Sequence, residues 1–83
     1  MVNRMGTRWR GKIPIPDHCH PLVRKLIAEC NAQQTTISEV ASRANLRRES
    51  ISEWRYRRMP KIDNFEAALN AIDLELVIRE RRA

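Results

Sequence analysis

The chain has 83 residues, with 16 Lys and Arg against 10 Asp and Glu, which gives a formal net charge of +6. This length allows one domain with a small core, and the charge fits DNA, RNA or an anionic membrane surface equally well. No apolar run reaches the roughly 18 residues of a membrane span and no signal peptide is apparent, so we expect a cytoplasmic protein without a membrane segment.

Residues 1–19 form the first predicted unit, a flexible basic N-terminal arm. The segment is poor in periodic apolar residues, and its Pro14–Ile15–Pro16 sequence favours extended backbone. Arg8, Arg10 and Lys12 suit a short arm that reaches into a DNA minor groove. The alternative is an inert, disordered tail.

The cluster His18–Cys19–His20 suggests a metal site, with Cys30 as a fourth ligand. Neighbouring residues rarely share a face, however, and the spacing matches none of the usual zinc patterns. We therefore expect no metal, no cofactor and two free thiols. The chain also lacks a paired-carboxylate cluster and a glycine-rich phosphate loop, so we do not expect an enzyme.

A first helix is predicted over residues 21–32, because Pro21 suits the first turn of a helix and apolar residues follow at helical spacing. The residues expected to be buried are Leu22, Val23, Leu26, Ile27 and Cys30. Residues 33–35 form a short polar connection.

A second helix is predicted from Thr36 to about residue 43 or 44. Thr36 and Glu39 have the spacing of a capping box, in which the hydroxyl accepts from the Glu39 amide and the carboxylate reaches back. Asn45 stands where the following turn needs a left-handed residue, which asparagine tolerates well.

A third helix is predicted over residues 47–57, since the residue before Pro60 is disfavoured in a helix. Ile51 and Trp54 are three residues apart and fit its core face. Two short helices joined by so tight a turn must cross steeply, which is the geometry of a helix-turn-helix. Trp54 is expected to pack in the core rather than to stack on bases, and the role of Tyr56 stays open.

A fourth helix is predicted over residues 62–72, with Ile62, Phe65, Leu69 and Ile72 on its core face. After Asp73 the period changes to the alternation typical of a β-strand. The predicted units are therefore the arm, a DNA-binding domain over residues 20–73, and a strand with a charged tail over residues 74–83.

With these elements placed, the chain resembles the Cro/C1-type (Xre-family) helix-turn-helix regulators. The resemblance covers most of the chain and rests on Val40–Ala41, Ala44–Asn45–Leu46, Ile51 and Trp54, on the loop and helix around Pro60 and Phe65, and on Leu74–Glu–Leu–Val–Ile78. It implies a mainly α, four-to-five-helix, lambda-repressor-like domain with a short C-terminal β-strand for dimerisation, from a bacterial or phage source. The chain departs from the family pattern at Ile37, Asn45 and Arg47.

The family motif places base contacts on the outward face of the third helix, whose polar side chains can hydrogen-bond base edges. These residues are Arg47, Arg48, Glu49, Ser52 and Glu53. Phosphate contacts are expected from the first amides of the second helix and from the basic residues that follow the third, namely Thr36, Ile37, Ser38, Arg55, Arg57, Arg58 and Lys61. The alternatives are a Glu53–Arg57 salt bridge and a merely solvated basic surface.

These features predict a non-enzymatic, sequence-specific transcriptional regulator that binds double-stranded DNA. We expect a repressor that occupies a palindromic operator as a homodimer, paired through Leu74, Leu76, Val77 and Ile78. An antitoxin-like protein that neutralises a partner toxin is the alternative. An RNA-binding protein is a third reading, which the missing RRM and KH signatures disfavour.

Overall fold

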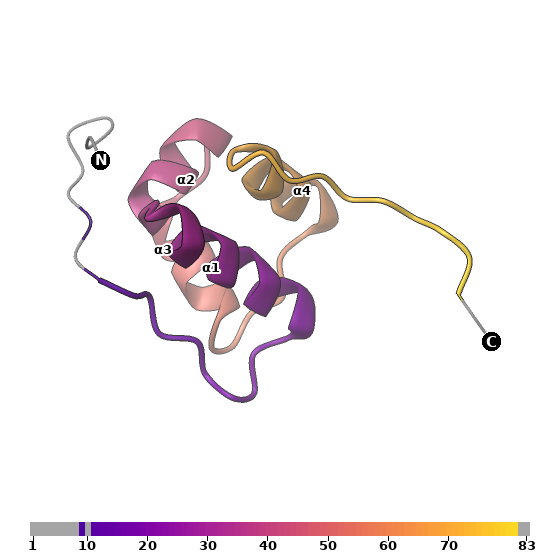
Figure 1. Cartoon of the computed structure of the whole chain (residues 1–83), viewed down its shortest axis with the longest axis horizontal. Helices are drawn as coiled ribbons and strands as arrows, with labels where there is room; N and C mark the ends of the chain where they lie inside the picture. The colour runs from indigo at the N-terminus through magenta and orange to yellow at the C-terminus, as the bar shows by residue number, and fades with distance from the viewer. Residues whose placement is uncertain (1–8, 10, 82–83) are drawn as a thin grey trace.

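The computed structural model describes residue 9 and residues 11–81, and in them the chain forms a small all-helical body (Figure 1). The helices are α1 (Pro21–Gln33), α2 (Ile37–Ala44), α3 (Arg48–Trp54) and α4 (Ile62–Asn70). A mainly α fold was predicted, and the structure confirms it. Within the described part of the chain, no helix is long and apolar enough to cross a membrane.

Helix α1 begins with a side-chain cap from the residue before Pro21. The Nδ1 atom of His20 accepts a hydrogen bond from the Leu22 amide at 3.1 Å. The core face matches the prediction except at Leu22, which is 53% exposed. Leu22 lies in the first turn of α1, where the neighbouring elements do not cover it.

Helix α2 is bounded as the sequence predicts. The Thr36 hydroxyl accepts from the Glu39 amide at 3.1 Å, and Asn45 ends the helix with φ of 59°. The expected return contact of the Glu39 carboxylate does not form, because that carboxylate instead pairs with Arg43 at 3.3 Å. Arg43 also donates to the Ala71 carbonyl at 3.0 Å, which ties α2 to the end of α4.

Helices α3 and α4 are both shorter than predicted. The backbone leaves α-helical geometry after Trp54, where the amide of Arg58 bonds the Glu53 carbonyl at 3.2 Å. Helix α4 stops at Asn70, and the left-handed Asp73 then turns the chain away. Ile62 was expected in the core but is 78% exposed. It is the first residue of α4, where neighbouring elements do not cover its side chain.

The core is a single cluster drawn from all four helices and the segments that flank them. Trp54 of α3 and Phe65 of α4 meet edge to face, with ring centroids 6.1 Å apart. The buried apolar residues are Cys19, Val23, Leu26, Ile27, Cys30, Val40, Ala41, Ile51, Trp54, Phe65, Ala68, Leu69 and Ile72. Trp54 therefore packs in the core, as predicted.

Residues 13–19, directly before α1, are fixed on the body, where a flexible arm was expected. Asn31 clamps the backbone of Ile13, accepting from its amide at 2.7 Å and donating to its carbonyl at 3.1 Å. Ile13 and Ile15 pack against the core, and Cys19 is buried. Two isoleucines spaced by one residue in extended backbone share a face, which gives the segment an apolar side to bury. Arg8 and Arg10 lie outside the described residues, and Lys12 is exposed.

Residues 74–81 take no regular secondary structure and extend away from the body (Figure 1). Leu74 and Leu76 pack partly against the core, whereas Val77 and Ile78 are 66% and 98% exposed. In this single chain, residues 77 and 78 lie beyond the part of the tail that contacts the body. Pairing of this segment as a strand requires a second chain and stays a prediction.

Replacing Trp54 by alanine tests the core. The indole is 93% buried against Phe65, so Trp54→Ala should lower the free energy of unfolding by about 3–5 kcal/mol, measured by urea denaturation. Tyr56→Ala is the matched control, because this ring is half exposed and its loss should cost far less. Equal losses in the two variants would contradict the assignment.

Candidate functional site

The connection between α2 and α3 is a three-residue turn with a left-handed first residue. Asn45 carries the positive φ, and the Leu46 amide bonds the Ala41 carbonyl at 2.8 Å, which closes the end of α2. Leu46 is half-buried beneath the turn. Ile51 of α3 and Val40 of α2 are both buried, so the opposite side of α3 is turned to solvent.

This outward side of α3 carries the predicted base-contact residues. Arg48, Glu49 and Glu53 are exposed on the helix, and Arg47 is exposed just before it as the N-cap residue. Arg47 makes no side-chain cap hydrogen bond, so its guanidinium is not engaged in holding the helix end. Four charged side chains of both signs thus share one accessible surface of a short helix.

Arg55 and Ser52 are held in a buried contact instead of facing solvent. Arg55 is only 9% exposed, and its guanidinium donates to the Pro14 carbonyl at 2.9 Å and to the Ser52 hydroxyl at 3.0 Å. Arg55 was predicted to contact phosphate, and its burial removes it from that role. Ser52 is half-buried, and its hydroxyl keeps its proton and one acceptor lone pair for another partner.

Glu53 forms a salt bridge with Arg58 at 3.3 Å rather than with the expected Arg57. The Arg57 amide bonds the Glu53 carbonyl at 3.0 Å, so the backbone keeps one helical turn to residue 57, although the Glu53 side chain pairs with Arg58. Both side chains are largely exposed, and such a pair contributes little stability. Either residue can therefore leave the pair for another partner at small cost.

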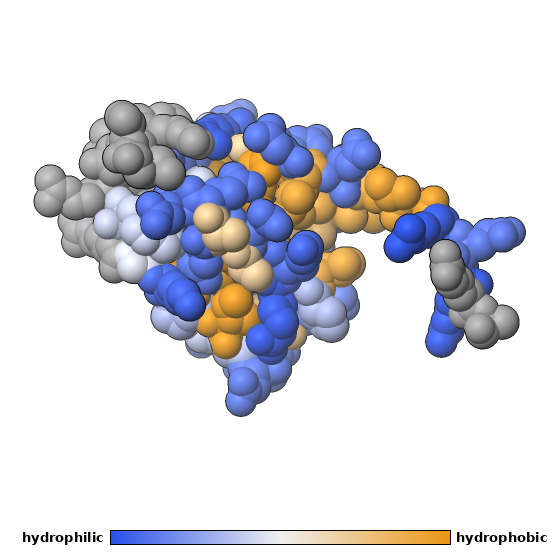
Figure 2. Space-filling view, in the orientation of Figure 1, coloured by the Kyte–Doolittle hydropathy of each residue, from blue (hydrophilic) through white to orange (hydrophobic). Residues whose placement is uncertain are grey.

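The predicted phosphate contacts fall on two parts of the surface. Arg57, Arg58 and Lys61 are exposed in the connection between α3 and α4. Thr36, Ile37 and Ser38 are half-buried at the start of α2, and the Ile37 side chain packs on the core. Only backbone groups and the two hydroxyls are then accessible at this helix end. Hydrophilic side chains cover most of the molecular face seen in Figure 2.

The histidines and cysteines have structural partners. His18 donates from Nε2 to the Tyr56 carbonyl at 3.2 Å, and His20 caps α1. Cys19 and Cys30 are buried free thiols, and burial, with the nearby Glu29 charge adding to it, raises the pKa of Cys30 to about 12. The residues described include no group of three or more His, Cys, Asp or Glu placed to hold a metal ion.

Sequence reasoning missed the contacts that join segments far apart in the chain. The clamp from Arg55 to Pro14 and the bond from His18 to Tyr56 have no local signal, since their partners are 41 and 38 residues away. The cap on α1 did have a local signal in the sequence. His20, whose side chain has a hydrogen-bond acceptor, directly precedes Pro21.

No protein-family model, curated protein or solved structure matches this chain. Its interpretation rests on the chemistry and geometry of its own residues.

The Cys30 thiol predicts a distinctive alkaline response. Its pKa is higher in the fold than in the unfolded chain, so the fold favours the neutral thiol. This contribution is complete below pH 9 and is lost as the pH rises toward 12, at up to about 1.4 kcal/mol per pH unit. Urea unfolding of the parent should weaken faster over this range than that of Cys30→Ala, which lacks the group. Parallel pH profiles would contradict the assignment.

Proposed function

We propose that this chain is a non-enzymatic, sequence-specific DNA-binding regulator that inserts α3 into the major groove. The observation that supports this best is the set of exposed, charged side chains on the outward side of α3. This helix follows α2 after the left-handed turn at Asn45. A helix of this width fits the major groove, where each base pair offers a distinct pattern of donors and acceptors. An occupied promoter is then blocked, so we propose a repressor.

In this proposal the exposed side chains of α3 read bases. Arg48 donates in a bidentate pair to guanine O6 and N7, and Glu49 accepts from cytosine N4. Glu53 can do the same after releasing Arg58, with which it forms an exposed salt bridge. Arg47, exposed at the N-terminal end of α3, reaches either a base or a phosphate, and the half-buried Ser52 contributes at most its hydroxyl.

Phosphates on either side of the contacted bases are held by groups outside α3. Arg57, Arg58 and Lys61 supply positive charge from the connection after the helix. The first amides of α2, near Ser38, supply hydrogen-bond donors at the positive end of a helix dipole. These contacts fix the orientation of α3 without reading sequence.

The exposed tail is the proposed dimerisation element. Val77 and Ile78 are apolar and exposed, and the apolar colour continues along the base of the tail as it leaves the body (Figure 2). Antiparallel pairing of residues 74–78 with a second copy would satisfy their backbone groups and bury these side chains. A two-fold dimer would place two α3 helices about 34 Å apart, the repeat of one DNA turn.

The same exposed apolar residues support a second candidate, an antitoxin-like protein that binds a partner toxin. Val77 and Ile78 would then cover an apolar surface of a different protein. A stoichiometric second protein that co-purifies with this chain would favour this candidate. A homodimer of the isolated chain would favour the first.

The DNA proposal is tested on sites selected from random duplex DNA. Arg48→Ala should weaken binding to the selected site by about 1–3 kcal/mol and relax the preference at one base pair of each half-site. Arg58→Ala should instead weaken all sequences alike and flatten the salt dependence of binding.

Lys25→Ala is the matched control for net charge, since Lys25 is exposed on α1 and distant in sequence from the proposed interface. It should leave sequence preference unchanged. A failure of the parent chain to enrich any site would refute the proposal. If Arg48→Ala and Arg58→Ala lowered specific and non-specific affinity by one common factor, the division between base and phosphate contacts would be wrong.

Proline substitution in the tail tests the dimer. Val77→Pro removes one backbone donor and leaves the helical core untouched. Since alternate amides of a strand point to opposite sides, Ile78→Pro is tested beside it. One of the two variants should sediment as a folded monomer that binds the full site weakly.

Val77→Ala is the control that keeps the amide, and it should weaken the dimer less than the disruptive proline. Dimers that persist in both proline variants would place the interface elsewhere on the molecule.

A further inference from the structure

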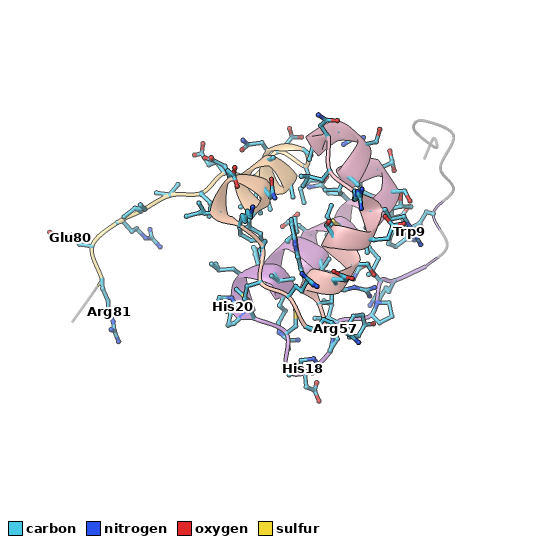
Figure 3. All side chains as sticks on the ribbon, turned by 180° about the vertical axis from the view of Figure 1, so that it is seen from behind. Trp9, His18, His20, Arg57, Glu80 and Arg81 are labelled. Carbon is cyan, nitrogen blue, oxygen red and sulfur yellow. The ribbon has the colours of Figure 1, made fainter. Side chains whose placement is uncertain are left out.

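A cavity of about 390 Å³ lies between the segment that precedes α1 and the chain that follows α3. Its two walls are residues 18–21 and residues 54–59, and His18, His20 and Arg57 lie along one edge of the molecule (Figure 3). The lining residues are His18, Cys19, His20, Pro21, Trp54, Arg55, Tyr56, Arg57, Arg58 and Met59.

The charged side chains of this lining are all arginines. Arg57 and Arg58 are exposed there, and none of the lining residues is Asp or Glu. Arg57 makes no ion pair with any residue that the structure describes, whereas Arg58 is shared with Glu53. Arg55 is buried, and its guanidinium donates to the Pro14 carbonyl and to the carbonyl and hydroxyl of Ser52, so it contributes mainly charge to this lining. The nearest acid before α1 is Asp17, which is exposed and outside the lining.

The cap on α1 fixes the hydrogen-bonding state of His20. Its Nδ1 accepts from the Leu22 amide and therefore carries no proton, so the ring proton is on Nε2. The exposed ring thus presents Nε2–H as a donor in a fixed tautomer. A donor held this way loses little freedom when it binds an acceptor.

His18 holds the two walls together. Its Nε2 donates to the Tyr56 carbonyl at 3.2 Å, which joins residues 38 positions apart in the chain. The buried Arg55 guanidinium donates to the Pro14 carbonyl, which also holds the chain after α3 against the segment before α1. These contacts fix the two chain segments relative to each other, and the exposed side chains of His20 and Arg57 extend from them.

We propose that this cavity binds a backbone phosphate of DNA, with the Nε2–H of His20 and the guanidinium of Arg57 as its donors. Guanidinium and imidazole N–H groups match the acceptor oxygens of a phosphate, and no acidic side chain of the lining opposes the anion. The inference rests on the proposed function and extends it. The segment before α1 becomes part of the DNA interface, beyond the bases that α3 reads.

Two substitutions test the site without removing the fold. His20→Asn keeps a residue that caps helices well but replaces the Nε2–H donor by a shorter amide that does not reach the same position, and Arg57→Ala removes the guanidinium. Arg57→Ala should weaken binding to all duplexes alike and reduce the slope of log affinity against log salt by about 1. His20→Asn should weaken binding roughly two- to tenfold, the value of one hydrogen bond. Lys25→Ala is again the charge control.

A second measurement separates this inference from the proposed function. Inorganic phosphate is titrated into the isotope-labelled protein, and the His20 ring and the Arg57 amide are followed by NMR. Their signals should shift to saturation in the parent, and the shifts should be lost in His20→Asn and Arg57→Ala. These losses, together with the DNA results above, would support the site.

Parent-like DNA affinity and salt slope in both variants would overturn the inference, together with the phosphate contact of Arg57, and leave the reading of bases by α3 standing. Phosphate-dependent shifts in a chain that binds no duplex DNA would retain an anion site but overturn its assignment to DNA.

Discussion

The buried guanidinium of Arg55 is the constraint on which the surface of this molecule depends. Removing such a charge from water costs several kcal/mol unless its donors are satisfied. Arg55 meets this requirement with the Pro14 carbonyl and the carbonyl and hydroxyl of Ser52, while it lies over the Tyr56 ring at 4.8 Å. These contacts hold the segment before α1 against the end of α3. They also set where the chain after α3 runs, and hence where its exposed basic residues stand.

The parts of the fold that the sequence predicted are those that local rules determine. The cap at Thr36 and the left-handed Asn45 depend on residues within one helical turn of each other. The placement of Trp54 in the core follows from its spacing with Ile51 and is confirmed. The charged residues of α3 were likewise found on one face by spacing alone, because the opposite face had to be apolar. Their role on DNA stays a proposal.

What could not be predicted depends on where helices end and what lies beside them. A helical pattern includes Leu22 and Ile62, but both are at the first turn of a helix, where neighbouring elements no longer cover them. The fixed segment around Ile13 is invisible to periodicity because its clamp, Asn31, is on another element. The burial of Arg55 reverses the usual expectation for an arginine, since it depends on a carbonyl far along the chain.

The contacts of Asn31 with Ile13 and of Arg55 with Pro14 can form only after the later residue of each pair has been synthesised. Ile13 precedes its partner Asn31 by 18 residues, and Pro14 precedes Arg55 by 41. At about 5–20 residues per second, the second interval corresponds to roughly 2 to 8 s of synthesis. During that time the apolar side of the segment has no finished surface to cover. The earliest part of the domain to be synthesised therefore waits for α3 before its contacts with Arg55 can form.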